Sequence, residues 1–234
     1  MDHQSSVQKS LKLRVRLPHH PNGEIMDKLE EQHYFATPVY IVKKPEFLDA
    51  LNMVSARYEE ASREHKGTGE YINLMTGSYA HEPELEEFTR YVSQTAWNIL
   101  SSQGFNMDTL ATYFTEMWTQ EHKHLSSMET HVHGGGSQIS AFYFLSVPKG
   151  GCKMVIHDPR PGKVIINLPE TDNAKITMGS SQVVFSAEPG VLILTNSWLP
   201  HSFTKNMSND PVRFVHMNLS VGLAPEQEPM VEVV

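Results

Sequence analysis

The second half of the sequence is a series of short runs rich in apolar, aromatic and β-branched residues, separated by turn residues. Runs of this composition are typical of β-strands, and the Gly, Pro, Asn and Asp residues between them are turn signals. The expected strands are 111–120, 138–147, 153–157, 163–167, 174–178, 181–186, 191–196, 201–205 and 212–221. Many short strands at this spacing indicate a sandwich or barrel, so we predict a jelly roll.

The part of the chain before residue 111 is predicted to be helical support for this β structure. Pro45 and Pro83 each suit the first turn of a helix, and apolar residues follow both at helical spacing. The two expected buried stripes are Phe47, Leu51, Val54 and Tyr58, and Leu85, Phe88, Val92, Ala96 and Ile99. We therefore divide the chain into an N-terminal arm (1–35), a helical support region packed on the barrel (36–110), the jelly-roll core (111–223) and a flexible tail (224–234).

The composition argues against several classes of protein. The formal net charge of -8 argues against sequence-indifferent binding to nucleic acid, which needs a basic face. No apolar run is long enough for a transmembrane helix, and the first ten residues lack the apolar region of a secretory signal. The single cysteine, Cys152, excludes an internal disulfide and fits a reducing compartment. We expect a soluble cytoplasmic protein with no membrane partner, and exposed sheet edges favour a homodimer.

Histidines at two distant places in the sequence are candidate metal ligands. His131 and His133 stand one residue apart at the head of a predicted strand, which would direct both imidazoles to one side of the sheet. The sequence NSWLPH, ending at His201, places a third histidine at the end of another strand. A catalytic iron site needs three protein ligands on one face and open positions for other ligands. His131, His133 and His201 supply them if the two strands are neighbours.

Other residues near these motifs have simpler explanations or offer alternatives. Taken singly, His122, His124, His157 and His216 are expected to be ordinary histidines. By the period of two, Glu129 shares a strand face with His131 and is an alternative carboxylate ligand. Asp158, in HDPRP, is a further candidate carboxylate ligand, but it is expected to form a turn. Trp118, Gln120 and Trp198 are candidate residues for the lining of a pocket, although tryptophans are more often core residues.

Arg213 lies between apolar residues in PVRFVHMN, twelve residues after His201, and is therefore expected on a buried strand. A buried arginine is costly unless it meets an anion, and its planar fork suits a carboxylate. One interpretation is an internal salt bridge. The other is a dicarboxylate cosubstrate whose far end binds Arg213 while its 2-oxo acid end chelates the metal.

These motifs together resemble a known family. HVHGGGSQISAFYFL, HDPRP, PGVLILTNSWLPHSF and RFVHMN resemble the 2-oxoglutarate- and iron(II)-dependent oxygenases, and are most similar to oxygenases of cyanobacterial viruses and marine bacteria related to the prolyl-hydroxylase type. The resemblance covers most of residues 34–221. It implies a mainly β fold, a double-stranded β-helix (jelly roll) with helices supporting one sheet. It also implies iron(II) and 2-oxoglutarate as cofactors, with O2, in a hydroxylase-type oxidation of a C–H bond.

The resemblance also assigns residues. His131 matches the first metal ligand, His201 the distal ligand and Arg213 the anchor of the oxoglutarate carboxylate. A tyrosine that touches oxoglutarate in prolyl-hydroxylase relatives corresponds to Tyr143, with Phe144 competing for that position. Asn218 either bonds the cosubstrate or belongs to the strand ladder.

The sequence departs from the superfamily at His133, where a carboxylate is expected. Three alternatives stay open: His133 ligates, Glu129 or another carboxylate replaces it, or solvent or an anion fills the position, as in halogenating relatives. One rival function is a cupin-like three-histidine dioxygenase that uses no oxoglutarate. Another is a non-catalytic viral jelly roll that acts as a binding module, in which the histidines are structural. The substrate is open between a protein side chain and a small metabolite.

Overall fold

The computed structural model describes residues 30–66, 73–166 and 168–224, and the chain separates after Pro38 into two units. Residues 30–38 contain no helix or strand, and everything described from Val39 onward belongs to the second unit. The predicted arm and the predicted flexible tail lie largely outside the described residues, so the domain boundaries stay predictions. None of the described helices is long and apolar enough to cross a membrane.

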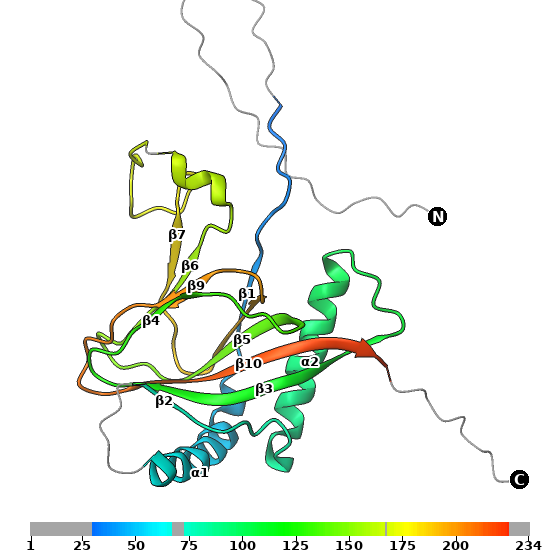
Figure 1. Ribbon diagram of the computed structural model, residues 1–234, viewed down its shortest axis with the longest axis vertical. Helices are drawn as coiled ribbons and strands as arrows, with labels where there is room; N and C mark the ends of the chain where they lie inside the picture. Colours follow the sequence, from blue (N-terminus) through cyan, green and yellow to red (C-terminus); the bar gives the residue numbers. More distant parts are fainter. Residues whose placement is uncertain (1–29, 67–72, 167, 225–234) are drawn as a thin grey trace, which may run out of the picture. The chain divides into compact units, whose positions relative to one another are not determined.

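The larger of two sheets has six antiparallel strands, and its central strands carry most of the residues discussed below. Across the sheet their order is β1 (Val39–Lys43), β8 (Val191–Asn196), β5 (Ser137–Ser146), β10 (Val212–Leu223), β3 (Leu110–His122) and β2 (Asn73–Met75). The long strand β10 pairs with β3 on one side and β5 on the other. Segments from both ends of the second unit therefore meet in one sheet (Figure 1).

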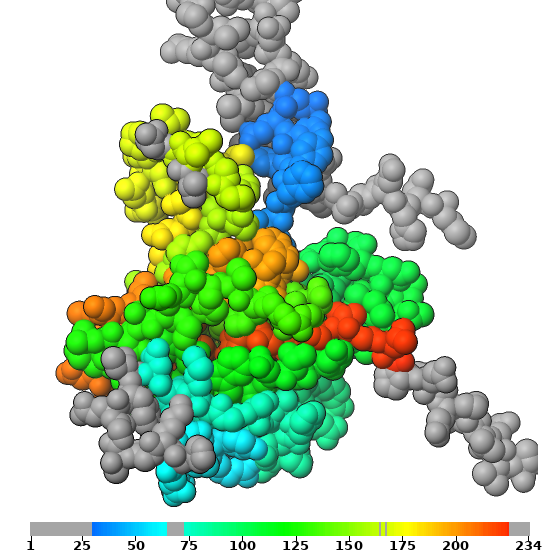
Figure 2. Space-filling view, in the orientation of Figure 1, coloured from blue at the N-terminus to red at the C-terminus, as the bar shows by residue number. Residues whose placement is uncertain are grey.

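The smaller sheet has four strands, in the order β4 (Met128–His131), β9 (His201–Phe203), β6 (Met154–His157) and β7 (Gln182–Phe185). One apolar cluster joins the two sheets, and its members come from both: Phe142, Phe144, Phe214 and Ile193 from the larger sheet, and Met154, Ile156 and Phe203 from the smaller. Figure 2 shows the green surface around β4 next to the orange surface around β9. Two facing antiparallel sheets with these connections confirm the predicted jelly roll.

Helices α1 (Leu48–Lys66) and α2 (Glu86–Ser102) cover the other side of the larger sheet (Figure 1). Each follows one 3-10 turn that begins at a proline, η1 (Pro45–Phe47) and η2 (Pro83–Leu85), as the sequence predicts. Of the two predicted stripes all residues are buried except Tyr58, which is partly buried. They pack on the sheet residues Met117, Val215 and Met217. The two predicted helices are thus present, and both pack on the larger sheet.

Two predicted strands are wrong. Residues 161–165 form a 3-10 helix, η3, and residues 174–178 contain no strand. The β-branched residues there have no facing layer, since Ile165, Ile166 and Ile176 are 82%, 59% and 70% exposed. A strand preference is realised mainly through packing against cross-strand and facing neighbours, which this excursion between β6 and β7 lacks. The helix α1 continues beyond the last residue of its predicted stripe, Tyr58, to Lys66.

The alternation of side chains along β10 divides the larger sheet into two faces. Val212 and Phe214 belong to the cluster between the sheets, whereas Val215 and Met217 belong to the cluster under the helices. We call these the inner face and the outer face. By the register with β10, the inner face of β3 carries Glu116, Trp118, Gln120 and His122.

Candidate metal centre

The three predicted ligands come together. One ligand nitrogen each from His131, His133 and His201 lies within 4.8 Å of the other two. The closest pair is His133 Nε2 and His201 Nε2, at 3.2 Å. Among the described residues this is the one group of three or more possible metal ligands. The two motifs are far apart in the sequence but adjacent in space, because β4 and β9 are neighbouring strands and His131 is the direct partner of His201.

His133 reaches the group by a route that the sequence argument did not anticipate. The His-x-His motif was expected at the head of a strand, but β4 ends at His131 and β5 begins only at Ser137. The backbone N–H of His133 donates to the Ser197 carbonyl at 2.9 Å, which fixes this connection beside the NSWLPH segment. Gly135 and Gly136 then turn the chain with φ of 66° and 88°, values that favour glycine.

Backbone carbonyls hold two of the three imidazoles in a fixed orientation. His131 Nδ1 lies 2.8 Å from the Glu129 carbonyl, and His201 Nδ1 lies 3.0 Å from the Leu199 carbonyl. A carbonyl only accepts, so each Nδ1 carries the proton and each Nε2 keeps its lone pair. That is the usual arrangement of histidines that bind metals. Glu129 therefore contributes its backbone, and its carboxylate is not among the clustered ligand atoms.

Burial keeps two of the three imidazoles uncharged. It lowers the pKa of His201 to about 4, and burial together with the neighbouring His131 lowers the pKa of His133 to about 4. Both rings are thus neutral at pH 7, which is the form that binds a metal ion. Three imidazoles that converge on one point fit an ion such as iron(II), for which imidazole is a suitable ligand.

Asn218 contacts the site, although not in the predicted way. Its amide nitrogen donates to Glu116 Oε2 at 3.0 Å and lies 3.3 Å from His133 Nδ1, while its Oδ1 accepts from Ser140 Oγ at 3.0 Å. The residue predicted to bind a cosubstrate is therefore the partner of a metal-ligand candidate. Glu116 was missed by the sequence argument, and only its inner-face register with Asn218 reveals it.

A layer of uncharged rings lies directly behind the three histidines. The His216 ring packs on His133, Trp118 and Phe142, with centroid distances of 4.6, 4.5 and 4.8 Å. Phe142 also contacts His201 at 5.0 Å. Burial lowers the pKa of His216 well below its usual value, so it is neutral. The expectation that His216 is an ordinary histidine misses this contact with the cluster.

Four inner-face side chains contain a buried polar atom without a hydrogen-bond partner: Trp118 Nε1, His122 Nδ1, His216 Nε2 and Thr195 Oγ1. Trp118 and His216 are direct cross-strand partners. Gln120 does not line an open pocket, since its amide contacts His122 Nε2 at 2.8 Å. Buried polar groups are normally hydrogen-bonded, so such a concentration beside a metal-ligand cluster calls for an explanation.

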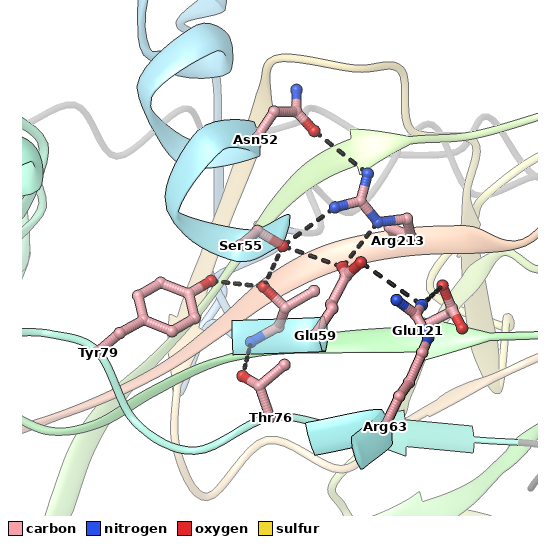
Figure 3. Close-up of polar contacts among 9 residues, drawn as sticks. Asn52, Ser55, Glu59, Arg63, Thr76, Tyr79, Glu121 and Arg213 are labelled. Atoms are coloured by element: carbon pink, nitrogen blue, oxygen red, sulfur yellow. Dashed lines mark hydrogen bonds and ion pairs between the residues drawn. The ribbon is translucent and has the colours of Figure 1, made fainter. Parts of the chain in front are cut away.

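Arg213 does not face the histidines, and its predicted role as a cosubstrate anchor needs correction. It lies on the outer face, where its Nε donates to Glu59 Oε1 at 2.8 Å (Figure 3). Its two remaining nitrogens donate to Ser55 Oγ and Asn52 Oδ1 on the same helix, α1. The alternative interpretation, an internal salt bridge, is the one that the geometry supports. The physical reason is the strand period of two, which directs Val212 and Phe214 inward and Arg213 outward.

Tyr143 and Phe144 lie on opposite faces of β5. The Tyr143 hydroxyl donates to the Lys44 carbonyl at 2.7 Å, and its ring packs on Phe88 of α2, so it is a core residue under the helices. Its predicted contact with a cosubstrate is therefore not supported. Phe144 faces inward and packs on Phe214.

Two further expectations concern surface residues. Asp158 forms ion pairs with Arg160 and Lys163 and accepts from the Arg160 backbone, as expected for a turn residue. These partners lower its pKa to about 2. Trp198 is 51% exposed, beside the NSWLPH turn that leads to His201.

Comparison with known proteins agrees with the resemblance. A family model described as "Putative 2OG-Fe(II) oxygenase" matches residues 116–215, which include all three histidines. No curated protein matches the chain. Among solved structures, AviO1 from Streptomyces viridochromogenes is 14% identical with a TM-score of 0.52, covering 82% of this chain and 92% of its own.

Two solved prolyl hydroxylases are also similar. One, a prolyl-4-hydroxylase from Pseudomonas putida, is 12% identical with a TM-score of 0.51, covering 79% of this chain and 93% of its own. The other, from Trichoplax adhaerens, is 9% identical with a TM-score of 0.50, covering 77% and 82%. At these identities the structures show the fold alone. The family match over the histidine motifs shows that residues 116–215 are similar to the 2-oxoglutarate- and iron(II)-dependent oxygenases.

Proposed function

We propose that this protein is a non-haem iron(II) oxygenase whose metal is held by His131, His133 and His201. The observation that carries the proposal is the convergence of three imidazoles on one point, two of which burial keeps neutral. Bound there with a 2-oxo acid, iron(II) would supply the oxidising chemistry that the family name implies. The hydroxylase reaction, in which 2-oxoglutarate decarboxylation is coupled to oxidation of a C–H bond, is supported by the family match.

The surrounding residues orient the ligands and exclude water from one side. The Glu129 and Leu199 carbonyls hold the Nε2 atoms of His131 and His201 free. The rings of Phe142 and His216 line the inner side of the cluster. His131 and His133 are only partly buried, so the opposite side is open toward solvent and is where we place substrate access.

The charge of the proposed centre differs from that of a site with a carboxylate ligand. Three neutral histidines leave the full charge of a divalent ion, one unit more than two histidines with a carboxylate. Glu116 supplies a negative charge beside the cluster, because it acts on His133 and accepts a hydrogen bond from Asn218. We infer that Glu116 balances part of the excess positive charge without being a ligand.

A second candidate function is a three-histidine dioxygenase that uses no 2-oxoglutarate. Two observations favour it: the absence of a carboxylate from the ligand cluster in the described residues, and the position of Arg213 on the outer face. It predicts oxygen consumption that does not depend on 2-oxoglutarate.

The proposal is tested by titrating metal-free protein with iron(II) without oxygen, and then measuring succinate formation with 2-oxoglutarate and O2. We expect one iron per chain and loss of both binding and succinate in His201→Ala. The matched control is His157→Ala, because His157 lies next to β9 but bonds Ser202 and Thr130 instead of the cluster. Unaltered iron binding in His201→Ala would contradict the proposed ligand set. Oxygen consumption without succinate would favour the second candidate.

Three further expectations stay predictions: a homodimer, a cytoplasmic location and the lack of a nucleic-acid partner. The strands β2 and β7 are edge strands and leave unpaired backbone groups, which supports the homodimer. Light scattering of the purified protein would give the mass of the particle and decide between monomer and dimer.

A further inference from the structure

The inner face beside the metal cluster carries no positively charged side chain on the four central strands. The inward residues of β10 are Val212, Phe214, His216 and Asn218, and those of β3 are Glu116, Trp118, Gln120 and His122. The inward residues of β5 and β8 are Ser140, Phe142, Phe144, Ile193 and Thr195. The only charge among them is the negative one of Glu116.

The arginine that would serve as an anion partner is fully engaged elsewhere. Three nitrogens of Arg213 donate to α1, and its ion pair with Glu59 balances its charge. Turning this side chain inward would leave Glu59, whose side chain is 6% exposed, without its closest cation. Arg213 would also have to pass through the sheet, since inward and outward positions do not interconvert without a shift of register.

The unsatisfied polar atoms of the inner face are uncharged. Trp118 Nε1 can only donate, and it is buried without a partner. His216 Nε2 is likewise unpartnered on a side chain that is 2% exposed, and its ring stacks on His133. His216 lies directly behind His133, and Trp118 lies behind His216. A ligand that extends past His133 would meet aromatic rings and a neutral N–H donor.

A carboxylate and an uncharged carbonyl differ sharply in the free-energy cost of leaving water for such surroundings. A carboxylate that leaves water without a cation suffers a large desolvation penalty, and the nearby Glu116 would repel it. An uncharged oxygen suffers much less and can still accept a hydrogen bond from Trp118. A guanidinium would favour a dicarboxylate over a 2-oxo acid with an uncharged tail, but the inward residues named above include no guanidinium.

We propose that the inner face receives the end of the 2-oxo acid remote from the metal as an uncharged acceptor, through Trp118 and His216, and does not select a carboxylate there. The inference rests on the proposed iron centre and narrows its cosubstrate: 2-oxo acids with an uncharged tail bind at least as well as 2-oxoglutarate. Arg213 takes no part in this recognition.

The test is calorimetric titration of the iron(II)-loaded protein, without oxygen, with three ligands. These are 2-oxoglutarate, its 5-methyl ester and 2-oxopentanoate, which has neither charge nor acceptor at its far end. We expect the dissociation constant of the ester to be lower than that of 2-oxoglutarate or within about 3-fold of it. The far carboxylate of 2-oxoglutarate finds no cation on the inner face, so it does not gain the charged hydrogen bond that would be worth about 10-fold or more in affinity. We expect 2-oxopentanoate to bind several-fold more weakly than the ester.

Two variants sharpen the result. Trp118→Phe should remove the difference between the ester and 2-oxopentanoate, because only a hydrogen-bond donor is lost. Arg213→Lys keeps a cation on the outer face and should leave the ratio of the three affinities unchanged. If either variant does not fold, the ligand ratios of the unaltered protein still decide the question.

The outcomes separate this inference from the proposed function. Iron binding with a preference of 10-fold or more for 2-oxoglutarate over the ester would overturn the inference and leave the iron centre intact. Iron binding without binding of any of the three ligands would also overturn it and favour the oxoglutarate-free dioxygenase. Failure to bind iron at all would contradict the proposed function itself.

Discussion

The two faces of strands β3 and β10 have opposite chemistry, although residues on them alternate one by one. On the outer face, charged and hydroxyl side chains form a connected network with α1: Arg213 bonds Glu59, Arg63 bonds Glu121, and Ser55 Oγ contacts Thr119 Oγ1 (Figure 3). On the inner face, buried Trp118, His122 and His216 each leave a polar atom unpaired.

The contrast distinguishes a structural polar cluster from a functional one. A buried network in which every member is paired fixes how a helix docks on a sheet. Unpaired buried groups cost stability, so their concentration beside three clustered histidines is better explained by a missing ligand than by the fold. Arg213 looks like a functional residue in the sequence, but in the structure it belongs to the structural polar cluster.

The largest expected effect lies on the outer face. Arg213→Ala leaves Glu59, which is almost fully buried, without its closest cation, and should lower the free energy of unfolding by about 3 kcal/mol. Iron affinity should not change, because the guanidinium faces away from the histidines. Chemical denaturation and iron titration of the same variant measure both quantities.

A matched control for this change is Arg57→Ala on the same helix. Arg57 pairs with Glu82 and Glu84, but its side chain is 48% exposed, so its loss should lower stability far less than the loss of Arg213. If Arg213→Ala lowered iron affinity while leaving stability intact, the division between the two faces would be wrong.

The next largest effect lies on the inner face, where the substitution should abolish the stabilisation of the protein by iron. A ligand that binds only the folded protein stabilises it, by about 2.7 kcal/mol at a free concentration 100 times the dissociation constant. Added iron(II) should therefore raise the unfolding temperature of the unaltered protein and of Arg57→Ala, but not of His131→Ala. A thermal melt with and without metal measures this shift. An equal shift in His131→Ala would show that the metal binds elsewhere.

The fold was largely predictable because its signals are local. The two prolines with helical stripes, and most short strands between turn residues, lie where the sequence places them. Residues 163–167 and 174–178 were misassigned because composition reports strand preference but not the presence of a neighbouring strand. Their segment protrudes between β6 and β7, where no layer covers it.

The site was predictable only in part. The three histidines stand out because two motifs of the right chemistry lie beside strand ends. The direction of Arg213 was not readable, because β10 is buried on both faces and its sequence is apolar on both. In such a strand, a shift of one residue in register moves every side chain to the opposite face of the sheet. Nothing in PVRFVHMN shows which residues point inward and which point outward. Glu116 was missed for the same reason, since only the register places it beside Asn218.

A smaller effect depends on pH and concerns His122. Burial between Phe203 and Phe214 lowers its pKa to about 4 from the usual 6.5. Because the folded-state pKa is the lower one, the unfolded chain takes up the proton first, and stability falls as the pH drops from about 6.5 toward 4. Linkage gives a loss of about 2 kcal/mol between pH 7 and 5 from this residue.

His122→Phe should remove that share of the acid sensitivity, since phenylalanine fits the aromatic neighbours and does not titrate. Denaturant unfolding at pH 7 and pH 5 measures it. The exposed His124 provides the control, because His124→Gln should leave the acid sensitivity as it is. A pH dependence that is identical in His122→Phe and the unaltered protein would show that this ring is not held neutral.

The smallest effect tests how the inner face orients the third ligand. As Asn218 is oriented, its N–H faces His133 Nδ1, so the His133 proton lies on Nε2, directed at the lone pair of His201 Nε2. Metal binding through His133 Nε2 requires that proton on Nδ1 and an acceptor beside it. Asn218 supplies one by turning its amide through 180°, which replaces the nitrogen by Oδ1.

Asn218→Leu, which offers no acceptor, should weaken iron binding about 10-fold, whereas Asn218→Asp, which offers a fixed acceptor, should retain the affinity or increase it. Outer-face Asn52, which bonds Arg213, provides the matched control, and Asn52→Leu should not affect iron binding. Iron titration separates the three variants. A merely structural role would make Leu and Asp at position 218 equally harmful, whereas a role in orienting His133 requires the acceptor and gives the two changes opposite outcomes.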